Sequence, residues 1–367
     1  MNSPLRLEKR TSASTTVNLM IPTISVILAL AIGALFLLGA GHNPVQAYSA
    51  MFNGGFGSVY GLTETIVKGI PLMLCALGIS LAFRMHLWNI GAEGQLYMGT
   101  FGATWVALSF PDSPAIFVLP AMVLMGMLCG GIWAMLPAVP RAYLGVNEII
   151  TTLMLNYVAI LWVDYLVMGP WKDPDGFNFP LTAQFSDAAT LPTFGDTRIH
   201  AGLLFAIAIA IIIYFAMKRT RWGYEVRVIG RSQSAAKYAG MNIPKNIIII
   251  LVLSGAVSGL AGMAEVSGLM GRLQQGFSPG YGYTGIIIAW LAKLHPGAII
   301  IVSILFGGLQ AGGFSLQSSG VPAAMVSMLQ GTILFFVLGG EILTRYRIVL
   351  NFRSKDTGGK STWKQAS

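Results

Sequence analysis

Long apolar stretches alternate with short polar segments along this chain. Ten of the stretches hold about 20 mostly apolar residues, the length at which an α-helix crosses the ~30 Å hydrocarbon layer of a bilayer. The pattern predicts an all-α polytopic membrane protein with about ten transmembrane helices. The eighth stretch is short and rich in glycine, so it is predicted either as a full or as a partial span. The ten stretches cover residues 20–40, 63–83, 92–110, 115–138, 147–168, 201–217, 247–268, 280–294, 296–314 and 321–341.

Composition supports a membrane protein and excludes an ordinary soluble domain. Hydrophobic residues make up 54% of the 367 residues, charged residues make up 10%, and mean hydropathy is +0.68. Soluble domains carry about 25% charged residues. A soluble core is not compatible with so little charge.

The basic residues predict which segments face the cytoplasm. Most of the 23 lysines and arginines fall in the N-terminal tail 1–19, the loop 218–246, the C-terminal tail 346–367 and other connections on the same side of a ten-helix arrangement. Cytoplasmic loops are enriched in these residues. We therefore expect cytoplasmic N- and C-termini, a transmembrane domain over 20–345, and an extracytoplasmic loop at 169–200. The net charge of +9 follows from this topology and requires no nucleic-acid partner.

The sequence predicts no catalytic residue, metal site or bound cofactor. Cys75 and Cys129 lie in apolar stretches, and the four histidines lack metal-ligand spacing. Residues 359–361 match the end of a phosphate-binding loop, but Ser354 stands where that motif requires its first glycine. If ATP is used, we expect another chain to hydrolyse it.

Two polar and flexible segments, 88–95 and 276–285, interrupt the apolar stretches. Irregular backbone at membrane depth is tolerated where it is buried in protein or lines a wet cavity, so a pair of breaks in corresponding halves predicts a translocation pathway between two inverted halves. A glycine-rich turn is the alternative for each segment. The candidate pathway residues within them are Asn89, Glu93, Gln95, Tyr281 and Tyr283.

Polar residues also recur along the predicted helix 147–168. Glu148 and Asn156 approximate one helical face, and Asn147 immediately precedes it. Polar side chains are costly in lipid, so this face is expected to meet another helix or water. Asn147, Glu148 and Asn156 are therefore candidate pathway residues, with structural hydrogen bonding between helices as the alternative.

Glycine is dense in the apolar stretch 247–268. Small residues let the backbones of membrane helices approach closely, so this stretch is predicted to pack tightly against its neighbours. The glycines concerned are Gly255, Gly259, Gly262 and Gly268.

A short helix is predicted inside the loop 218–246. Ser232 or Ser234 suits its N-cap, Gly240 suits the C′ position, and Pro244 prevents its continuation. The pattern indicates a small, smooth helix displayed to the cytosol, either as a docking element or as a solvated part of the loop.

Three motifs together carry a family resemblance: LAFRMHLWNIGAEGQLYMGTFGA from Leu81, GVNEIITTLMLNYVA from Gly145, and IGRSQSAAKYAGMNIPK from Ile229. In this order they resemble the permease subunits of bacterial ATP-binding-cassette (ABC) importers of the simple-sugar, branched-chain amino acid and nucleoside type. The chain is most similar to the longer permease of nucleoside uptake systems. The resemblance implies a multi-pass subunit of the bacterial inner membrane that does no catalysis itself.

The same resemblance implies the partners and the solute. The expected partners are a second permease, either non-identical or a second copy, two ABC ATPase subunits that bind Mg-ATP, and an extracytoplasmic binding protein. The expected solute is a nucleoside, with a pentose as the alternative. An ion-coupled secondary transporter is the competing class, and the absence of a convincing chain of carboxylates within the membrane argues against it.

By position, residues 231–245 correspond to the coupling helix through which such permeases contact their ATPases. Small residues there are expected to enter a cleft on the ATPase, with one tyrosine as an anchor and basic residues at the rim. Ser234 stands where an acidic residue is often found in the family. The expected ATPase-coupling residues are Arg231, Ser234, Ala235, Ala236, Tyr238 and Gly240.

Overall fold

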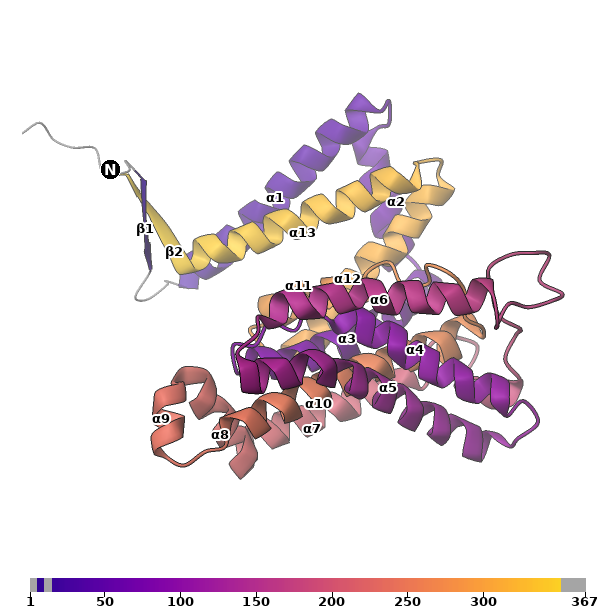
Figure 1. The fold of residues 1–367 in the computed structure, drawn as a ribbon. Helices are drawn as coiled ribbons and strands as arrows, with labels where there is room; N and C mark the ends of the chain where they lie inside the picture. The colour runs from indigo at the N-terminus through magenta and orange to yellow at the C-terminus, as the bar shows by residue number, and fades with distance from the viewer. Residues whose placement is uncertain (1–4, 10–14, 351–367) are drawn as a thin grey trace, which may run out of the picture. The chain divides into compact units, whose positions relative to one another are not determined.

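The computed structural model describes residues 5–9 and 15–350, and helices dominate it (Figure 1). A 3₁₀ turn covers Asp187–Ala189, and a π turn covers Val266–Met270. The helices are α1 Thr15–Gly39, α2 Pro44–Phe56, α3 Val59–Phe83, α4 Ala92–Ser109, α5 Ala115–Leu144, α6 Glu148–Met168, α7 Gly202–Arg219, α8 Arg221–Arg231, α9 Gln233–Tyr238, α10 Ile243–Glu265, α11 Tyr281–Leu291, α12 Pro296–Ser318 and α13 Ala323–Arg345.

One small sheet departs from the predicted all-α fold. Strands β1 (Leu5–Lys9) and β2 (Tyr346–Leu350) pair antiparallel, within segments that were predicted as tails. Short runs of alternating apolar and polar residues, such as LRLEK, suit a strand. The remainder of the C-terminal tail, residues 351–367 with the incomplete phosphate-loop sequence, lies outside the described residues.

The chain divides into two compact units. The larger comprises residues 41–330, and the smaller comprises residues 1–40 and 331–367. The smaller unit holds β1, α1, most of α13 and β2. The features described below lie in the larger unit.

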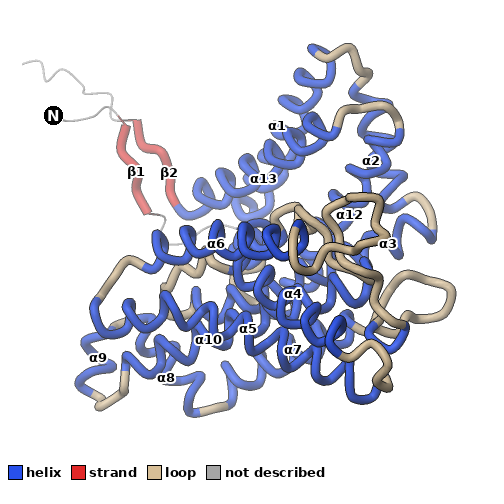
Figure 2. Tube along the Cα trace, turned by 45° about the vertical axis from the view of Figure 1, so that its right-hand side comes forward, coloured by secondary structure: helices blue, strands red, loops and turns tan. Residues whose placement is uncertain are grey.

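Helix α3 is the central helix of the larger unit. It packs against α2, α7, α10, α11 and α12, and 89% of its membrane-spanning window is buried. A helix that is apolar around most of its circumference is covered by protein or by lipid, and here other helices supply most of the cover. Helix α10 is also largely enclosed and packs against α3, α4 and α5 (Figure 2). Helices α5, α6 and α7 instead leave apolar faces exposed, as helices in contact with lipid do.

Glycines allow α10 to contact its neighbours backbone to backbone. A Cβ atom at Gly99 of α4 would lie 2.2 Å from the Cα atom of Gly259, and one at Gly130 of α5 would lie 2.4 Å from the carbonyl oxygen of Gly255. Close approach of this kind is typical of helix association in membranes. The close packing predicted for this glycine-rich stretch is confirmed.

The predicted count of ten spans is not confirmed. Six of the described helices, α3, α5, α6, α7, α10 and α12, are long and apolar enough to cross a membrane. Helix α11 occupies the predicted stretch 280–294 but has only 11 residues. At 1.5 Å per residue it is about 16 Å long, roughly half the hydrocarbon thickness. Of the two alternatives for this stretch, the structure has the partial span, because the glycine-rich break takes up the first part of the stretch.

The connection between α6 and α7 is fixed to the segment that follows α10. Its backbone pairs with this segment through Thr182 N–H to the Leu273 carbonyl (2.9 Å) and Phe185 N–H to the Gly271 carbonyl (2.8 Å). His200, at its end, is buried, and burial lowers its pKa to about 4, so the imidazole is uncharged at neutral pH. This connection lies at the opposite end of the larger unit from α8 and α9 (Figures 1 and 2).

Candidate functional site

The two predicted helix breaks meet inside the protein, where α4 and α11 begin beside each other. The backbone N–H of Gly282 donates a hydrogen bond to Oε2 of Glu93 (2.7 Å). The ring centroids of Tyr97 and Phe277 lie 4.5 Å apart. A Cβ atom at Gly282 would lie 2.3 Å from the backbone nitrogen of Glu93, so only glycine permits this contact. The starts of both helices are therefore held together as one structural element.

Asn89 joins the first break to α10. Its Nδ2 donates to Oε1 of Gln95 and to Oγ of Ser254, each at 2.9 Å, and Nε2 of Gln95 donates back to Oδ1 of Asn89 at 2.9 Å. Asn89 is 0% exposed and Gln95 is 1% exposed. These buried amides satisfy each other, which removes most of the cost of placing them in the membrane.

Asn156 joins α6 to the same region. Its Oδ1 accepts a hydrogen bond from the backbone N–H of Gly94 (2.8 Å). Its Nδ2 donates to the carbonyl of Ile90 (2.9 Å) and to the hydroxyl of Tyr283 (3.1 Å). A single side chain thus connects α6 with the first break and with α11.

Tyr281 extends the hydrogen bonding to α10. Its hydroxyl donates to Oε1 of Glu265 (3.1 Å), and Nζ of Lys68 lies 3.9 Å from the same oxygen. Glu265 is fully buried, and its Oε2 has no hydrogen-bond partner among the described residues. We call the connected pathway candidates the polar seam: Asn89, Glu93, Gln95, Asn156, Tyr281 and Tyr283.

Two further pathway candidates lie at the margin of the polar seam. Asn147 is exposed and is the N-cap of α6, where its Oδ1 accepts from the N–H of Ile149 (2.9 Å). Glu148 is buried, accepts from the N–H of Trp88 (3.2 Å) and forms an ion pair with Arg141 (3.1 Å). Asn147 is thus placed to cap a helix, and Glu148 to anchor the first break.

The polar seam is closed in this structure. Its members, apart from Tyr283, are buried. Asn89 bonds to Gln95 and Asn156 bonds to Tyr283, whereas Glu93 accepts from the Gly282 backbone and Tyr281 donates to Glu265, so together these bonds link α4, α6, α10 and α11. Tyr283 is 36% exposed and is the member with the most accessible surface. The sequence offered two interpretations of these residues, hydrogen bonding between helices and a solute pathway. Both concern the same side chains.

We predict that Glu93→Leu destabilises the folded protein. The substitution removes the acceptor of the buried Gly282 N–H, and a buried unsatisfied donor costs about 1–3 kcal/mol. Thermal unfolding in detergent should show a lower midpoint for Glu93→Leu than for Glu93→Gln, which retains a side-chain oxygen acceptor. Equal midpoints for the two variants would contradict a structural role for this hydrogen bond.

The basic loop between α7 and α10 forms two helices instead of one. Helix α8 folds back on the end of α7, and a Cβ atom at Gly223 would lie 2.3 Å from the carbonyl oxygen of Ala216. The short helix α9 has Ser232 as its N-cap, whose Oγ accepts from the N–H of Ala235 (3.2 Å). Gly240 follows α9 with φ +72°, a left-handed conformation that favours glycine. The predicted helix within the loop is confirmed, but it is confined to Gln233–Tyr238.

Helix α8 connects the loop to the ends of α3 and α11. A Cβ atom at Gly230 would lie 2.1 Å from the carbonyl oxygen of Arg84. Nη2 of Arg84 donates to the carbonyl of Leu294 (2.6 Å), just after α11. The rings of Trp88 and Trp290 stack nearby, with centroids 5.5 Å apart. Helix α8 therefore contacts Arg84, just before the first break, and the Arg84 side chain reaches the segment after α11.

The predicted coupling residues differ in how much of each residue is exposed. Ala236 is 0% exposed, so internal packing already accounts for its small size. Tyr238 is 95% exposed at the end of α9. The others, Arg231, Ser234, Ala235 and Gly240, are exposed. The protruding feature of the loop is thus an aromatic side chain surrounded by small and basic residues.

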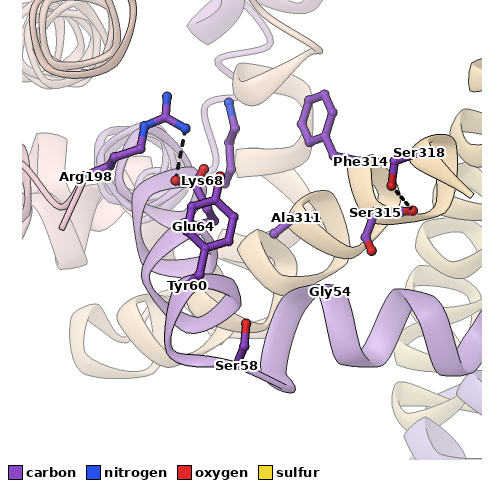
Figure 3. Close-up of a pocket in the computed structure, with 10 residues that line it drawn as sticks. All are labelled: Gly54, Ser58, Tyr60, Glu64, Lys68, Arg198, Ala311, Phe314, Ser315 and Ser318. Atoms are coloured by element: carbon purple, nitrogen blue, oxygen red, sulfur yellow. Dashed lines mark hydrogen bonds and ion pairs between the residues drawn. The ribbon is translucent and has the colours of Figure 1, made fainter.

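A cavity that the sequence did not predict lies among α2, the start of α3 and the end of α12 (Figure 3). Its volume is about 480 Å³. Nη1 of Arg198 and Oε1 of Glu64 form an ion pair across 3.1 Å at its edge. Its lining residues are Gly54, Ser58, Tyr60, Glu64, Lys68, Arg198, Ala311, Phe314, Ser315 and Ser318.

Sequence reasoning could find only part of this cavity. Glu64 and Lys68 are conspicuous as charges four residues apart, and their spacing indicates that they pair with each other. In the structure Glu64 instead pairs with Arg198, and Lys68 pairs with Glu265. The aromatic members carry no local signal, because their common position depends on how distant helices pack.

Comparison with known proteins identifies the family. Residues 61–338 match the family described as "Branched-chain amino acid transport system / permease component". The chain belongs to this family. The resemblance inferred from the three motifs is thereby confirmed, and the chain is a multi-pass membrane protein and a permease component of an ABC transporter.

Relatives of this chain include permeases named for glucose and for guanosine. The chain is 39% identical to the glucose ABC transporter permease protein TsgB13 of Haloferax volcanii, over 99% of this chain and 100% of that protein. It is 35% identical to the guanosine ABC transporter permease protein NupP of Bacillus subtilis, over 87% of this chain and 93% of that protein. A second guanosine ABC transporter permease protein of Bacillus subtilis, NupQ, is 24% identical over 67% of this chain and 79% of that protein.

Proposed function

We propose that this chain is one permease subunit of an ATP-driven importer that carries a nucleoside across the cell membrane. The observation that carries the proposal is the displayed helix α9, with Tyr238 95% exposed, on a loop whose other helix, α8, contacts Arg84 at the end of α3. An exposed aromatic side chain on a rigid, polar loop is typical of an anchor for a protein partner.

The partner at this loop is an ABC ATPase, and the complex contains two such subunits. Mg-ATP is bound and hydrolysed by them, and this chain contributes no catalytic residue. When ATP binds, α9 moves. Because Gly230 of the same loop contacts Arg84, the movement displaces Arg84 and then the first helix break, which follows it. The permease thereby changes between inward-open and outward-open arrangements, two states whose populations the ATPases bias.

The remaining partners are a second permease and an extracytoplasmic binding protein. Two different guanosine permeases from one organism, NupP and NupQ, are both similar to this chain, which supports a non-identical second subunit. The binding protein docks at the 169–200 connection, opposite α9, and this connection is braced by its hydrogen bonds to residues 267–273. The N- and C-terminal tails lie on the cytoplasmic side, and the pairing of β1 with β2 supports a common side for both.

The polar seam, together with Asn147 and Glu148, flanks the pathway. Rocking of the helices would exchange its internal hydrogen bonds for bonds to water or solute, at little net cost because donors and acceptors remain satisfied. Among the members of the polar seam, Tyr283 is the one that is exposed in this structure. The guanosine relatives support a nucleoside as the solute, and the glucose relative keeps a neutral sugar as the second candidate.

We predict that Tyr238→Ala weakens ATPase association. Truncation of an aromatic anchor at a protein interface costs about 2 kcal/mol or more, roughly a 30-fold loss of affinity. Co-purification of the ATPase subunits with the variant should fall, and uptake should fall with it. The matched control is Tyr165→Ala, a tyrosine on α6 that is 60% exposed. Association that is unchanged in Tyr238→Ala, or that is lost equally in both variants, would contradict the proposed interface.

We predict opposite labelling of two exposed glutamines replaced by cysteine. Gln184 lies in the 169–200 connection and Gln233 begins α9. An impermeant maleimide should label Gln184→Cys in right-side-out vesicles and Gln233→Cys only in inside-out vesicles, because the basic loop is cytoplasmic. The unsubstituted protein controls for Cys75 and Cys129. The reverse pattern would overturn the orientation.

A further inference from the structure

The cavity shown in Figure 3 combines open aromatic surface with charged and hydroxyl groups. Tyr60 is 67% exposed and Phe314 is 56% exposed, and both line it. Its volume of about 480 Å³ falls within the range of small-molecule sites, about 300–1,000 Å³. The cavity thus has the size and the mixed lining of a site for a small polar solute with a ring.

The rings of this cavity are not simply lipid-facing. Nζ of Lys68 lies 5.3 Å from the centroid of the Phe314 ring. An ammonium over an aromatic face belongs to a polar environment, because lipid would not solvate the charge. Phe314 therefore presents its ring to a polar hollow, where another flat ring or a sugar face can pack against it.

The charges of the cavity are already balanced. Arg198 pairs with Glu64 at 3.1 Å, and Lys68 pairs with Glu265, which lies buried behind it, at 3.9 Å. The two cations are thus offset by two carboxylates, and the four groups together carry no net positive charge. A phosphate ester would add negative charge beside Glu64 and Glu265, whereas an uncharged solute leaves the balance unchanged. Balanced charge favours a neutral solute.

Hydroxyl groups provide the remaining polar contacts. Oγ of Ser58 accepts from the N–H of Gly61 (2.9 Å), so its own hydrogen can be donated to a solute. Oγ of Ser318 donates to the carbonyl of Ser315 (2.7 Å), so its lone pairs can accept from one. One donor and one acceptor in the same hollow suit the hydroxyls of a sugar.

We propose that this cavity binds an uncharged, hydroxylated solute with a flat ring, a nucleoside, and excludes its phosphorylated form. This inference rests on the proposed importer function and deepens it, because it assigns a solute site to the permease itself. Tyr60 and Phe314 supply the ring contacts, and the two ion pairs supply the discrimination against phosphate.

The test is equilibrium binding of tritiated guanosine to the assembled transporter in lipid nanodiscs, without ATP and without the binding protein. Loss of one aromatic stacking partner weakens binding of a base by about 10-fold. Tyr60→Ala and Phe314→Ala should each show a loss of this order, and Tyr60→Phe should bind as the unsubstituted complex does. Phe117→Ala, a change at a 71% exposed ring on α5 outside the cavity, is the matched control.

Guanosine 5′-monophosphate and glucose serve as competitors. The monophosphate should compete at least about 10-fold less well than guanosine. Equal competition would overturn the proposed exclusion of phosphate. Binding of guanosine to both alanine variants as tight as to the unsubstituted complex would overturn the site.

An uptake assay separates failure of the site from failure of the nucleoside proposal. If the unsubstituted transporter accumulates glucose and not guanosine, the nucleoside proposal fails, and the same alanine variants are measured with labelled glucose. Weaker glucose binding in Tyr60→Ala and Phe314→Ala supports the cavity as a neutral-solute site. Unchanged glucose binding, or no binding of either probe to the unsubstituted complex, overturns it.

Discussion

Close backbone contact around α10 is the constraint on which the rest of the larger unit depends. In lipid there is no hydrophobic force to drive helices together, so association relies on van der Waals contact and on hydrogen bonds between helices. The glycines at 99, 130, 255 and 259 bring α4 and α5 against α10 at distances that any Cβ atom would prevent. With α10 fixed, Ser254 reaches Asn89 and Glu265 reaches Tyr281, which places both helix breaks beside one another.

This arrangement joins the basic loop between α7 and α10 to the polar seam and the cavity through stiff elements. Gly230 of α8 contacts the carbonyl of Arg84, the Arg84 guanidinium contacts the carbonyl of Leu294, and the first break begins a few residues after Arg84. Lys68, which lies toward the N-terminal end of α3, contacts both Glu265 and the ring of Phe314. Helix α3 therefore runs from its contact with α8 to the cavity, so a rigid-body shift of its C-terminal end would displace residues at both the polar seam and the cavity.

Much of the helical architecture could be predicted from apolar length alone, because a spanning helix leaves a long, uniform signal in the sequence. The two breaks were predictable as well, since glycines and polar residues clustered within an apolar stretch disfavour a continuous helix in lipid. For α11 the pattern left a full and a partial span open, because it does not show how much of the stretch the break takes up. The burial of Ala236 and the convergence of Tyr60, Arg198 and Phe314 depend on contacts between segments far apart in the chain, which no local pattern encodes.

The central claim is that a separate ATPase drives solute movement through this permease. The most direct measurement is accumulation of labelled guanosine in proteoliposomes that contain the whole complex, with its binding protein on the outside and ATP supplied to the ATPase side. The account predicts accumulation that requires hydrolysable ATP and that persists when a protonophore and a sodium ionophore remove the ion gradients. Accumulation that proceeds without ATP and stops when the gradients are removed would contradict it and would indicate an ion-coupled transporter.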